Sequence, residues 1–302
     1  MYKIRRFEQE VFEFYKTGQM AGLAHLYIGE EAVAAGACAA IEARDYIAST
    51  HRGHGHLVAR GADMGRMMAE ILGKETGYSK GKGGSMHIMA MDLGILGANG
   101  IVGGGIPMAT GAGYSAKYRG TDQVTLCFFG DGAANEGTFH ESINMAAAWD
   151  LPVVYVIENN LYGITVDSRR VTKEHDLAKR AIGYGIPGYT IDGNDVETVY
   201  KTMQKAVKHA REGKGPSIVE CKTYRHHGHN GSDPGTYRPP EEVEAWKARD
   251  PLILFRDKGY LTEKERKEIE DKVEQEVQAA CKFAAESPYP EASELMDDIF
   301  CD

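Results

Sequence analysis

The stretch Val124-Thr-Leu-Cys-Phe-Phe-Gly-Asp-Gly132 decides the fold, because an apolar run long enough for a buried strand ends directly in a polar turn. A second stretch, Val153-Val-Tyr-Val-Ile-Glu-Asn-Asn160, repeats this pattern. Between them, Phe139, Ile143 and Ala147 recur at helical spacing, so a helix of crossover length joins two buried strands. Such a βαβ unit predicts a parallel sheet with helices on both faces.

The sequence before this unit divides into a helical part and a glycine-rich part. Residues 1–45 carry apolar side chains at helical spacing, so we expect helices there, interrupted at Gly22. Residues 51–113 are rich in glycine, which indicates tight turns or close approach of the backbone to a ligand. We expect this region to be rich in loops and to build a site, with a helix from Pro107 to about Tyr118 at its end.

The sequence after the unit predicts further elements of the same kind. A helix is expected from about Val196 to Arg211 and a strand from Ser217 to Lys222. The segment between Tyr224 and Pro240 is rich in His, Gly, Asp and Pro and predicts a mobile loop. Mostly charged helix follows, in which Thr262 and Glu265 form a capping box.

Length and composition favour one α/β domain. The 302 residues are 42% hydrophobic and contain neither an internal repeat nor a recognisable linker. We therefore expect residues 1–302 to form a single domain with helical N-terminal and C-terminal extensions. The net charge of −9, from 35 Lys and Arg against 44 Asp and Glu, argues against a nucleic-acid or anionic-membrane partner.

The cysteines and the apolar stretches of the sequence indicate the cellular compartment of the protein. Five cysteines are scattered without a Cys-x-x-Cys pair, which suggests neither a disulfide framework nor a thiolate zinc site. The N-terminal residues are charged throughout, and no stretch approaches the roughly 20 apolar residues that a membrane span needs. These features predict a soluble, cytoplasmic protein.

Polar residues follow each of the two buried strands. Asp131 lies in a Gly-Asp-Gly motif directly after the first strand, and Asn160 lies in an Asn-Asn motif directly after the second. Open α/β sheets bind ligands at the carboxyl ends of such strands. A carboxylate and an amide oxygen suit Mg²⁺, whose remaining positions a diphosphate and water would fill. The helix expected to begin near Glu136 directs its N-terminal N–H groups to the same place.

Several other interpretations compete with a metal-bridged diphosphate. A plain turn would explain either motif alone, although the pairing of the two motifs is specific. A nicotinamide oxidoreductase would need Gly-x-Gly-x-x-Gly directly after a strand, and that fingerprint is missing. A noncatalytic binding subunit would tolerate loss of Asp131, Asn160 or the histidine His229 of the predicted loop, and all three are present. The histidines His51, His54 and His56 could be read as a zinc site, although a loop that binds phosphate and lines a pocket fits this context better.

The Gly-Asp-Gly motif with the later Asn-Asn resembles the motif of thiamine-diphosphate enzymes. From about residue 5 to the C-terminus, the chain is similar to the alpha subunits of pyruvate, branched-chain 2-oxo acid and acetoin dehydrogenases. The segments that carry this likeness are His25-Leu-Tyr-Ile-Gly-Glu-Glu-Ala32, Lys80-Gly-Lys-Gly-Gly-Ser-Met-His87, Gly100-Ile-Val-Gly103 and Tyr224-Arg-His-His-Gly-His229. The resemblance implies a three-layer thiamine-diphosphate-binding fold and an oxidoreductase that uses thiamine diphosphate and Mg²⁺.

The resemblance assigns the two strand ends to the metal and the diphosphate. It implies that Asp131, Asn160 and the main-chain carbonyl of Tyr162 hold Mg²⁺. It also implies that Gly132 and Ala133 donate N–H groups to the diphosphate.

The glycine-rich region supplies further cofactor-binding positions by the same resemblance. His51 and Arg52 stand where the family usually has Tyr-Arg, and the Arg52 guanidinium would clamp a diphosphate oxygen. Gly100 and Val102 match the stretch that holds the aminopyrimidine ring of the cofactor. A plain core role for Val102 stays open.

The predicted loop supplies the candidate catalytic residue. Arg225 would reach a phosphate. His229 matches the family histidine that contacts the cofactor and assists acyl transfer to a lipoyl group, a task suited to an imidazole near neutral pH.

The resemblance also bears on substrate and partners. Residues 96–107, 50–56 and 287–290 look most like acetoin dehydrogenase alpha subunits. Pyruvate dehydrogenase alpha subunits share most of these residues and remain the alternative, and a branched-chain 2-oxo acid dehydrogenase is more remote. A beta subunit would complete the active site in an α2β2 heterotetramer that docks on a dihydrolipoyl acyltransferase core.

Overall fold

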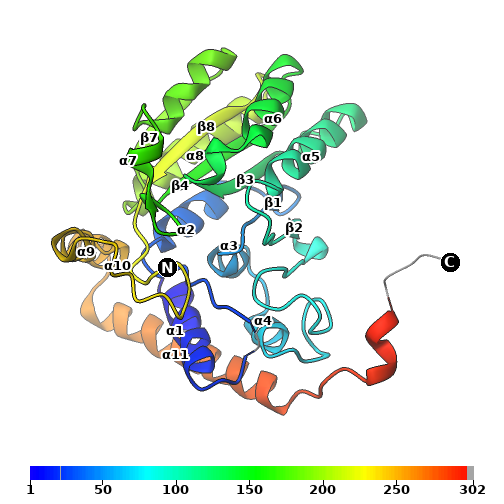
Figure 1. Cartoon of the computed structure of the whole chain (residues 1–302), viewed down its shortest axis with the longest axis vertical. Coiled ribbons are helices and arrows are strands. Elements are labelled where there is room, and N and C mark those ends of the chain that lie inside the picture. The colour runs from blue at the N-terminus through cyan, green and yellow to red at the C-terminus, as the bar shows by residue number, and fades with distance from the viewer. Residues whose placement is uncertain (21, 298–302) are drawn as a thin grey trace.

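A six-stranded parallel sheet forms the centre of the computed structural model, which describes residues 1–20 and 22–297 (Figure 1). The strand order is β2-β1-β3-β4-β8-β7, and every neighbouring pair is parallel. The strands are β1 (Tyr46–Ala48), β2 (Ile95–Gly97), β3 (Thr125–Gly130), β4 (Val153–Asn159), β7 (Gly188–Asp192) and β8 (Ser217–Lys222). Since α6 (Gly137–Ala148) connects the neighbours β3 and β4, the predicted βαβ unit is confirmed.

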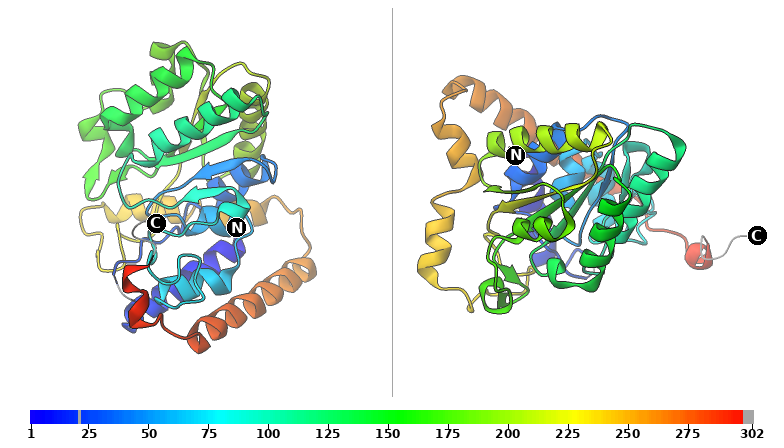
Figure 2. Two further views of the ribbon diagram at one scale, coloured as in Figure 1. Left: turned by 90° about the vertical axis from the view of Figure 1, so that its right-hand side faces the viewer. Right: turned by 90° about the horizontal axis from the view of Figure 1, so that it is seen from above.

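Helices cover both faces of the sheet, because alternate strand side chains enter two separate apolar clusters. On β3, Leu126 and Phe128 belong to one cluster, and Cys127 and Phe129 belong to the other. The helices that flank the sheet are α2 (Glu31–Ala39) and α8 (Val196–Arg211) on the Phe128 side, and α5 (Gly105–Arg119) and α6 on the Phe129 side (Figure 2). The predicted three-layer α/β fold is therefore confirmed.

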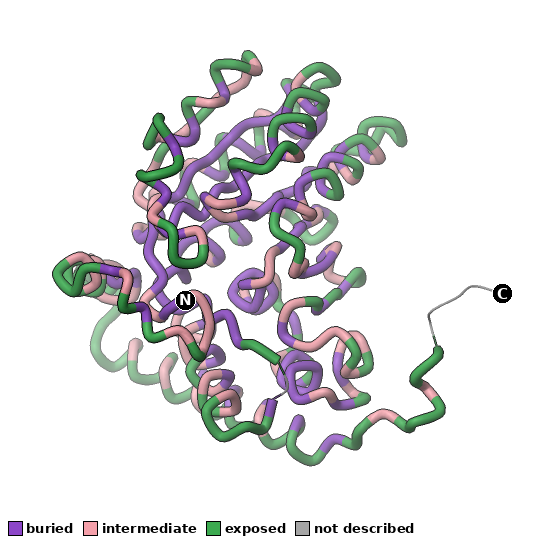
Figure 3. Tube along the Cα trace, viewed as in Figure 1, coloured by how far each residue is buried: buried purple, intermediate pink, exposed green. Residues whose placement is uncertain are grey.

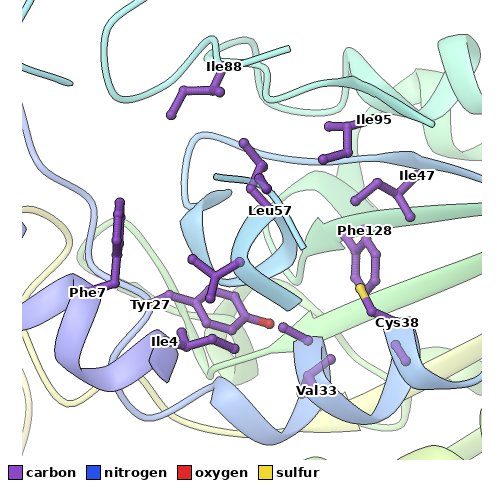
Figure 4. Close-up of a cluster of buried hydrophobic side chains, with 14 of the residues drawn as sticks. Ile4, Phe7, Tyr27, Val33, Cys38, Ile47, Leu57, Ile88, Ile95 and Phe128 are labelled. Carbon is purple, nitrogen blue, oxygen red and sulfur yellow. The ribbon is translucent and has the colours of Figure 1, made fainter. Parts of the chain in front are cut away.

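A further group of helices packs beneath the Phe128 side of the sheet. These helices are α1 (Tyr2–Lys16), α3 (His54–Ala59), α4 (Met64–Ile71) and α11 (Glu263–Glu286). Figure 4 shows Phe7 of α1 and Leu57 of α3 in the same buried cluster as Phe128. Buried residues follow the strands and the inward sides of the helices (Figure 3). Thr262 and Glu265 form the predicted capping box at the start of α11.

Short elements complete the chain. They are η1 (Met91–Leu93), η2 (Ala133–Asn135), β5 (Tyr162–Gly163), β6 (Val166–Asp167), α7 (Ser168–Val171), η3 (Leu177–Tyr184), α9 (Pro240–Lys247), α10 (Pro251–Asp257) and η4 (Ala292–Met296). The segment between β8 and α9 has no regular element, as predicted, and its mobility stays a prediction. No helix among the described residues has the length and apolar character that crossing a membrane requires.

One prediction about elements needs correction, and three strands of the central sheet were not predicted. The described part of residues 1–45 contains two helices, but residues 17–20 and 22–30 between them are irregular, so the break is wider than Gly22 alone. The glycine-rich residues 51–113 are rich in loops, as predicted, and also hold α3, α4, η1 and β2. Strands β1 and β2 span only three residues each, and so short a strand leaves no apolar run that the sequence alone would identify. Strand β7 lies at the sheet edge and is partly exposed, so its sequence lacks a continuous apolar pattern.

The cluster on the Phe129 side provides a test of the packing. Ile143 of α6 is fully buried, whereas its neighbour Asn144 is exposed. We expect Ile143→Ala to lower the free energy of unfolding by about 2–5 kcal/mol, because it leaves a cavity against the sheet. The matched variant Asn144→Ala should change it by less than about 0.5 kcal/mol. Urea unfolding of both variants measures the difference, and equal losses would contradict the assigned packing.

Candidate active site

A cavity of about 330 Å³ opens at the carboxyl ends of three adjacent strands, β1, β3 and β4. Its walls include residues that follow each strand, namely His51 and Arg52 after β1, Asp131 after β3 and Asn160 after β4. Arg225, from the segment after β8, closes one side. The sequence predicted the two central strand ends, and the unpredicted strand β1 brings the third set of residues to the same edge.

Strand register places the two motif residues on neighbouring strand ends. Gly130 is paired with Glu158, so Asp131 and Asn160 both lie just beyond the last paired residues. The chain then turns back sharply, with Leu161 at φ 73° and Ile164 at φ 53°, in a region that side chains other than glycine rarely adopt. This bend lets residues 162–164 line the cavity as well.

Asp131 carries an unused ligand atom. Its side chain is 2% exposed, and its Oδ2 has no hydrogen-bond partner among the described residues. Burial raises the pKa of this carboxyl to about 6. A buried oxygen without a partner costs free energy, and a divalent cation would satisfy it. The site therefore fits the predicted metal at this residue.

Asn160 is oriented by a carboxylate that the sequence reading did not single out. Its Nδ2 donates to Glu30 Oε1 at 2.9 Å, which directs its Oδ1 away from Glu30. Burial raises the pKa of Glu30 to about 8. The second oxygen of Glu30 has no hydrogen-bond partner among the described residues and lies 3.6 Å from Arg52 Nε. The adjacent acidic residues Glu30 and Glu31, directly before the apolar run of α2, were the sequence signal that could have identified it.

Two buried guanidinium groups face the same cavity. Arg52 is 4% exposed and donates to the carbonyl oxygen of His229 at 3.0 Å. Arg225 is 1% exposed, donates to Tyr237 Oη at 2.7 Å and also to the carbonyl oxygen of Ile164. Burial, together with the charge of Arg52, lowers the pKa of Arg225. Two buried cations side by side, with Arg225 Nε unpartnered among the described residues, fit a diphosphate ligand.

His229 lies beside these arginines. Its Nδ1 is 3.3 Å from Arg225 Nη1, and its backbone N–H donates to Asp233 Oδ2 at 2.6 Å. Burial, and then the charges of Arg52 and Arg225, lower the pKa of His229 to about 4. The imidazole is therefore neutral at pH 7, and an anion that offset the arginine charges would raise its pKa.

The three histidines of the glycine-rich region do not come together. His54 Nδ1 is 3.2 Å from Glu8, and His56 Nε2 is 2.9 Å from Glu158, and both imidazoles are fully buried. Among the described residues, His51 instead lies near His25 and His229. The alternative of a zinc site built from His51, His54 and His56 is therefore wrong, because packing directs two of these rings away from the cavity.

All but one of the residues predicted to bind the cofactor line the cavity. Val102, Gly132, Ala133 and Tyr162 line the cavity, as do the metal and arginine positions described above. Gly100 is absent from the cavity wall, and a Cβ atom there would lie 2.9 Å from His87 Nε2. A side chain at position 100 would therefore displace the exposed imidazole of His87, and contact of Gly100 with a cofactor stays a prediction.

The chain is similar to known proteins over nearly its whole length. Residues 1–293 match the family model described as dehydrogenase E1 component. The chain is 48% identical to the alpha subunit of an acetoin:2,6-dichlorophenolindophenol oxidoreductase from Bacillus subtilis, with 99% of this chain and 91% of that protein covered. It is 42% identical to the pyruvate dehydrogenase E1 component subunit alpha of Rickettsia felis, with 100% and 94% covered. It is 41% identical to a chloroplastic pyruvate dehydrogenase E1 subunit alpha of Oryza sativa, with 99% and 73% covered.

The neutral imidazole of His51 gives a prediction about acid stability. Burial lowers the pKa of His51 from 6.5 to about 2, so below pH 6.5 the unfolded chain gains a proton at this position that the folded chain does not. This loss of stability is absent above pH 6.5 and reaches about 2 kcal/mol at pH 5. We expect His51→Tyr to lose less stability than the parent between pH 7 and pH 5, as measured by urea unfolding. His175→Gln, at an exposed position, should behave like the parent.

Proposed function

Because the chain belongs to the dehydrogenase E1 component family, we propose that it is the alpha subunit of a thiamine-diphosphate-dependent oxidoreductase that cleaves acetoin and passes the acyl group to a lipoyl domain. The observation that carries this proposal is one cavity that combines an unpartnered buried carboxylate, Asp131, with the two buried guanidinium groups of Arg52 and Arg225. A metal-bridged diphosphate satisfies all three groups at once.

The strand ends would hold the metal and the diphosphate. Asp131, the Oδ1 atom of Asn160 and the main-chain carbonyl of Tyr162 would hold Mg²⁺, which would supply positive charge to the diphosphate. Gly132 and Ala133 would donate backbone N–H groups to the diphosphate, since they lie on the cavity wall at the start of η2.

The remaining cavity residues would place the rest of the cofactor. Arg52 and Arg225 would bind diphosphate oxygens, and residues near Gly100 and Val102 would contact the aminopyrimidine ring. Thiamine diphosphate, when bound, would supply a nucleophilic thiazolium carbon and a cationic ring that can accept the electron pair of the bond that breaks.

His229 would handle a proton during acyl transfer. With the arginine charges uncompensated, its pKa of about 4 makes it a weak base at neutral pH. A diphosphate between Arg52 and Arg225 would offset the arginine charges that lower the pKa of His229. Cofactor binding would therefore raise this pKa toward 7, where an imidazole exchanges protons readily.

Acetoin is favoured over pyruvate by sequence similarity. The relative with 48% identity is named for acetoin, whereas the pyruvate dehydrogenase relatives are 40–43% identical. Pyruvate dehydrogenase activity is the second candidate, since those relatives also match nearly the whole chain.

The proposed partner is a beta subunit, and the cavity mouth supports this. Ile101, Val102 and Ile164 line the cavity yet are 73%, 51% and 58% exposed. Apolar side chains left exposed at the edge of a site are typical of a surface that another subunit covers. We propose an α2β2 heterotetramer in the cytoplasm, docked on a dihydrolipoyl acyltransferase core, in which residues 1–302 form one domain.

Asn160→Ala tests the metal assignment. It removes a metal ligand, so we expect the affinity for thiamine diphosphate in the presence of Mg²⁺ to fall at least about tenfold, which is about 1.4 kcal/mol. Calorimetric titration of the assembled enzyme measures it. Asn144→Ala, on the exposed side of α6, is the matched control and should bind like the parent. An unchanged Mg²⁺-dependent affinity in Asn160→Ala would rule out this ligand.

Dye reduction tests the reaction. The chain is reconstituted with its beta subunit, thiamine diphosphate and Mg²⁺, and acetoin, pyruvate and branched 2-oxo acids are compared at equal concentrations. We expect the highest kcat/KM with acetoin. Preference for pyruvate would transfer the assignment to pyruvate dehydrogenase, and absence of dye reduction with every substrate would refute the proposed chemistry.

A further inference from the structure

A half-buried cation holds the turn that follows Asp131. Arg180 lies in η3, and its guanidinium donates to the carbonyl oxygen of Ala134 and to Asn135 Oδ1, the latter at 2.8 Å. Both acceptors belong to η2, the turn that begins directly after Gly132. Arg180 is not part of the cavity wall, so it acts on the site only through this turn.

The guanidinium of Arg180 is used as a fork with two acceptors. Among the described residues, neither acceptor is a carboxylate, and both belong to the same short turn. The guanidinium also lies over the ring of Phe139, 5.6 Å from its centroid. A planar fork that reaches two acceptors fixes their relative position, which the point charge of an ammonium group does not do.

The segment that carries Arg180 is itself fixed. Three apolar residues of η3 are buried in the cluster on the Phe129 side of the sheet, namely Leu177, Ala178 and Ala181. The N–H group of Ala178 also donates to the buried carboxylate of Glu220 on β8, at 3.2 Å. Core packing and a hydrogen bond therefore hold the base of the Arg180 side chain, so its fork gives the turn a defined position.

The turn that Arg180 contacts is short and carries small side chains. It spans three residues, and the methyl groups of Ala133 and Ala134 are buried. Asn135 is exposed, and its Nδ2 donates to Thr172 Oγ1 at 3.2 Å. Small side chains restrict a backbone little by packing, so the two contacts from Arg180 form a large part of what fixes this turn.

We propose that Arg180 is a positioning residue for the diphosphate of the cofactor. It would fix the turn at residues 132–135 so that the N–H groups of Gly132 and Ala133 are oriented before the cofactor binds. Donors that are oriented in advance bind an anion more tightly, because no free energy is spent on ordering them during binding. This inference rests on the proposed thiamine-diphosphate site and adds to it a residue from outside the cavity.

Calorimetric titration of the assembled enzyme with thiamine diphosphate and Mg²⁺ tests the proposal. We expect Arg180→Met and Arg180→Lys each to weaken binding at least about tenfold, because neither variant keeps the fork. Inorganic diphosphate is the second probe, and its affinity should fall by the same factor, since the affected N–H groups contact only that part of the cofactor. Lys179→Met removes the neighbouring exposed cation and is the matched control, with an affinity within about twofold of the parent.

Dye reduction with the preferred substrate separates positioning from a loss of folded protein. At saturating thiamine diphosphate, Arg180→Met should reach the parent kcat, while the cofactor concentration that gives half of this rate should rise with the dissociation constant. A role in stability alone would instead lower kcat with the folded fraction, measured by urea unfolding, and leave the cofactor affinity of the folded enzyme unchanged.

Three results would count against the proposal. Parent-like cofactor affinity in Arg180→Met would overturn it outright. Parent-like affinity in Arg180→Lys alone would overturn it as well, because charge without orientation would then explain the effect. Failure of the parent enzyme to bind thiamine diphosphate would refute the proposed function, and this inference with it.

Discussion

The hydrogen-bonded register between β3 and β4 is the constraint on which the site depends. Because Gly130 is paired with Glu158, the residues that follow each strand emerge side by side at the same edge of the sheet. A slip of one residue would turn every side chain of the shifted strand to the opposite face of the sheet and would change the position of Asp131 relative to Asn160. The apolar side chains on both faces of the two strands hold this register, so the core determines the geometry of the polar site.

Around that edge lie buried charged side chains that do not supply one another with all the hydrogen-bond partners they need. Glu30 lies 3.6 Å from Arg52, but Asp131 and Arg225 each retain a buried atom without a partner in the described part of the chain. Such an arrangement costs stability in the free protein, and a ligand that carries both a cation and an anion removes that cost. Stability and cofactor binding are therefore linked through the same few atoms.

The histidines show how packing separates residues of one type. His54 and His56 enter α3, where both nitrogens of each ring have hydrogen-bond partners. These partners are Glu8 and Ser85 for His54, and Glu158 and Ser49 for His56. His51 lies just outside that helix and stays at the cavity, where its neighbours are His25 and His229. Residues 51–56 thus place the imidazole rings of His54 and His56 in the core and that of His51 at the cavity.

The sequence by itself determined the βαβ unit, the parallel sheet, the strand ends that carry Asp131 and Asn160, and the family, because long apolar runs and their polar endings are local signals. Only the tertiary structure decided that the short strand β1 brings Arg52 to the same edge and that Glu30 orients Asn160. It also decided which histidines share a cavity. These contacts join residues far apart in the sequence, and no local pattern records which of them the folded core brings together.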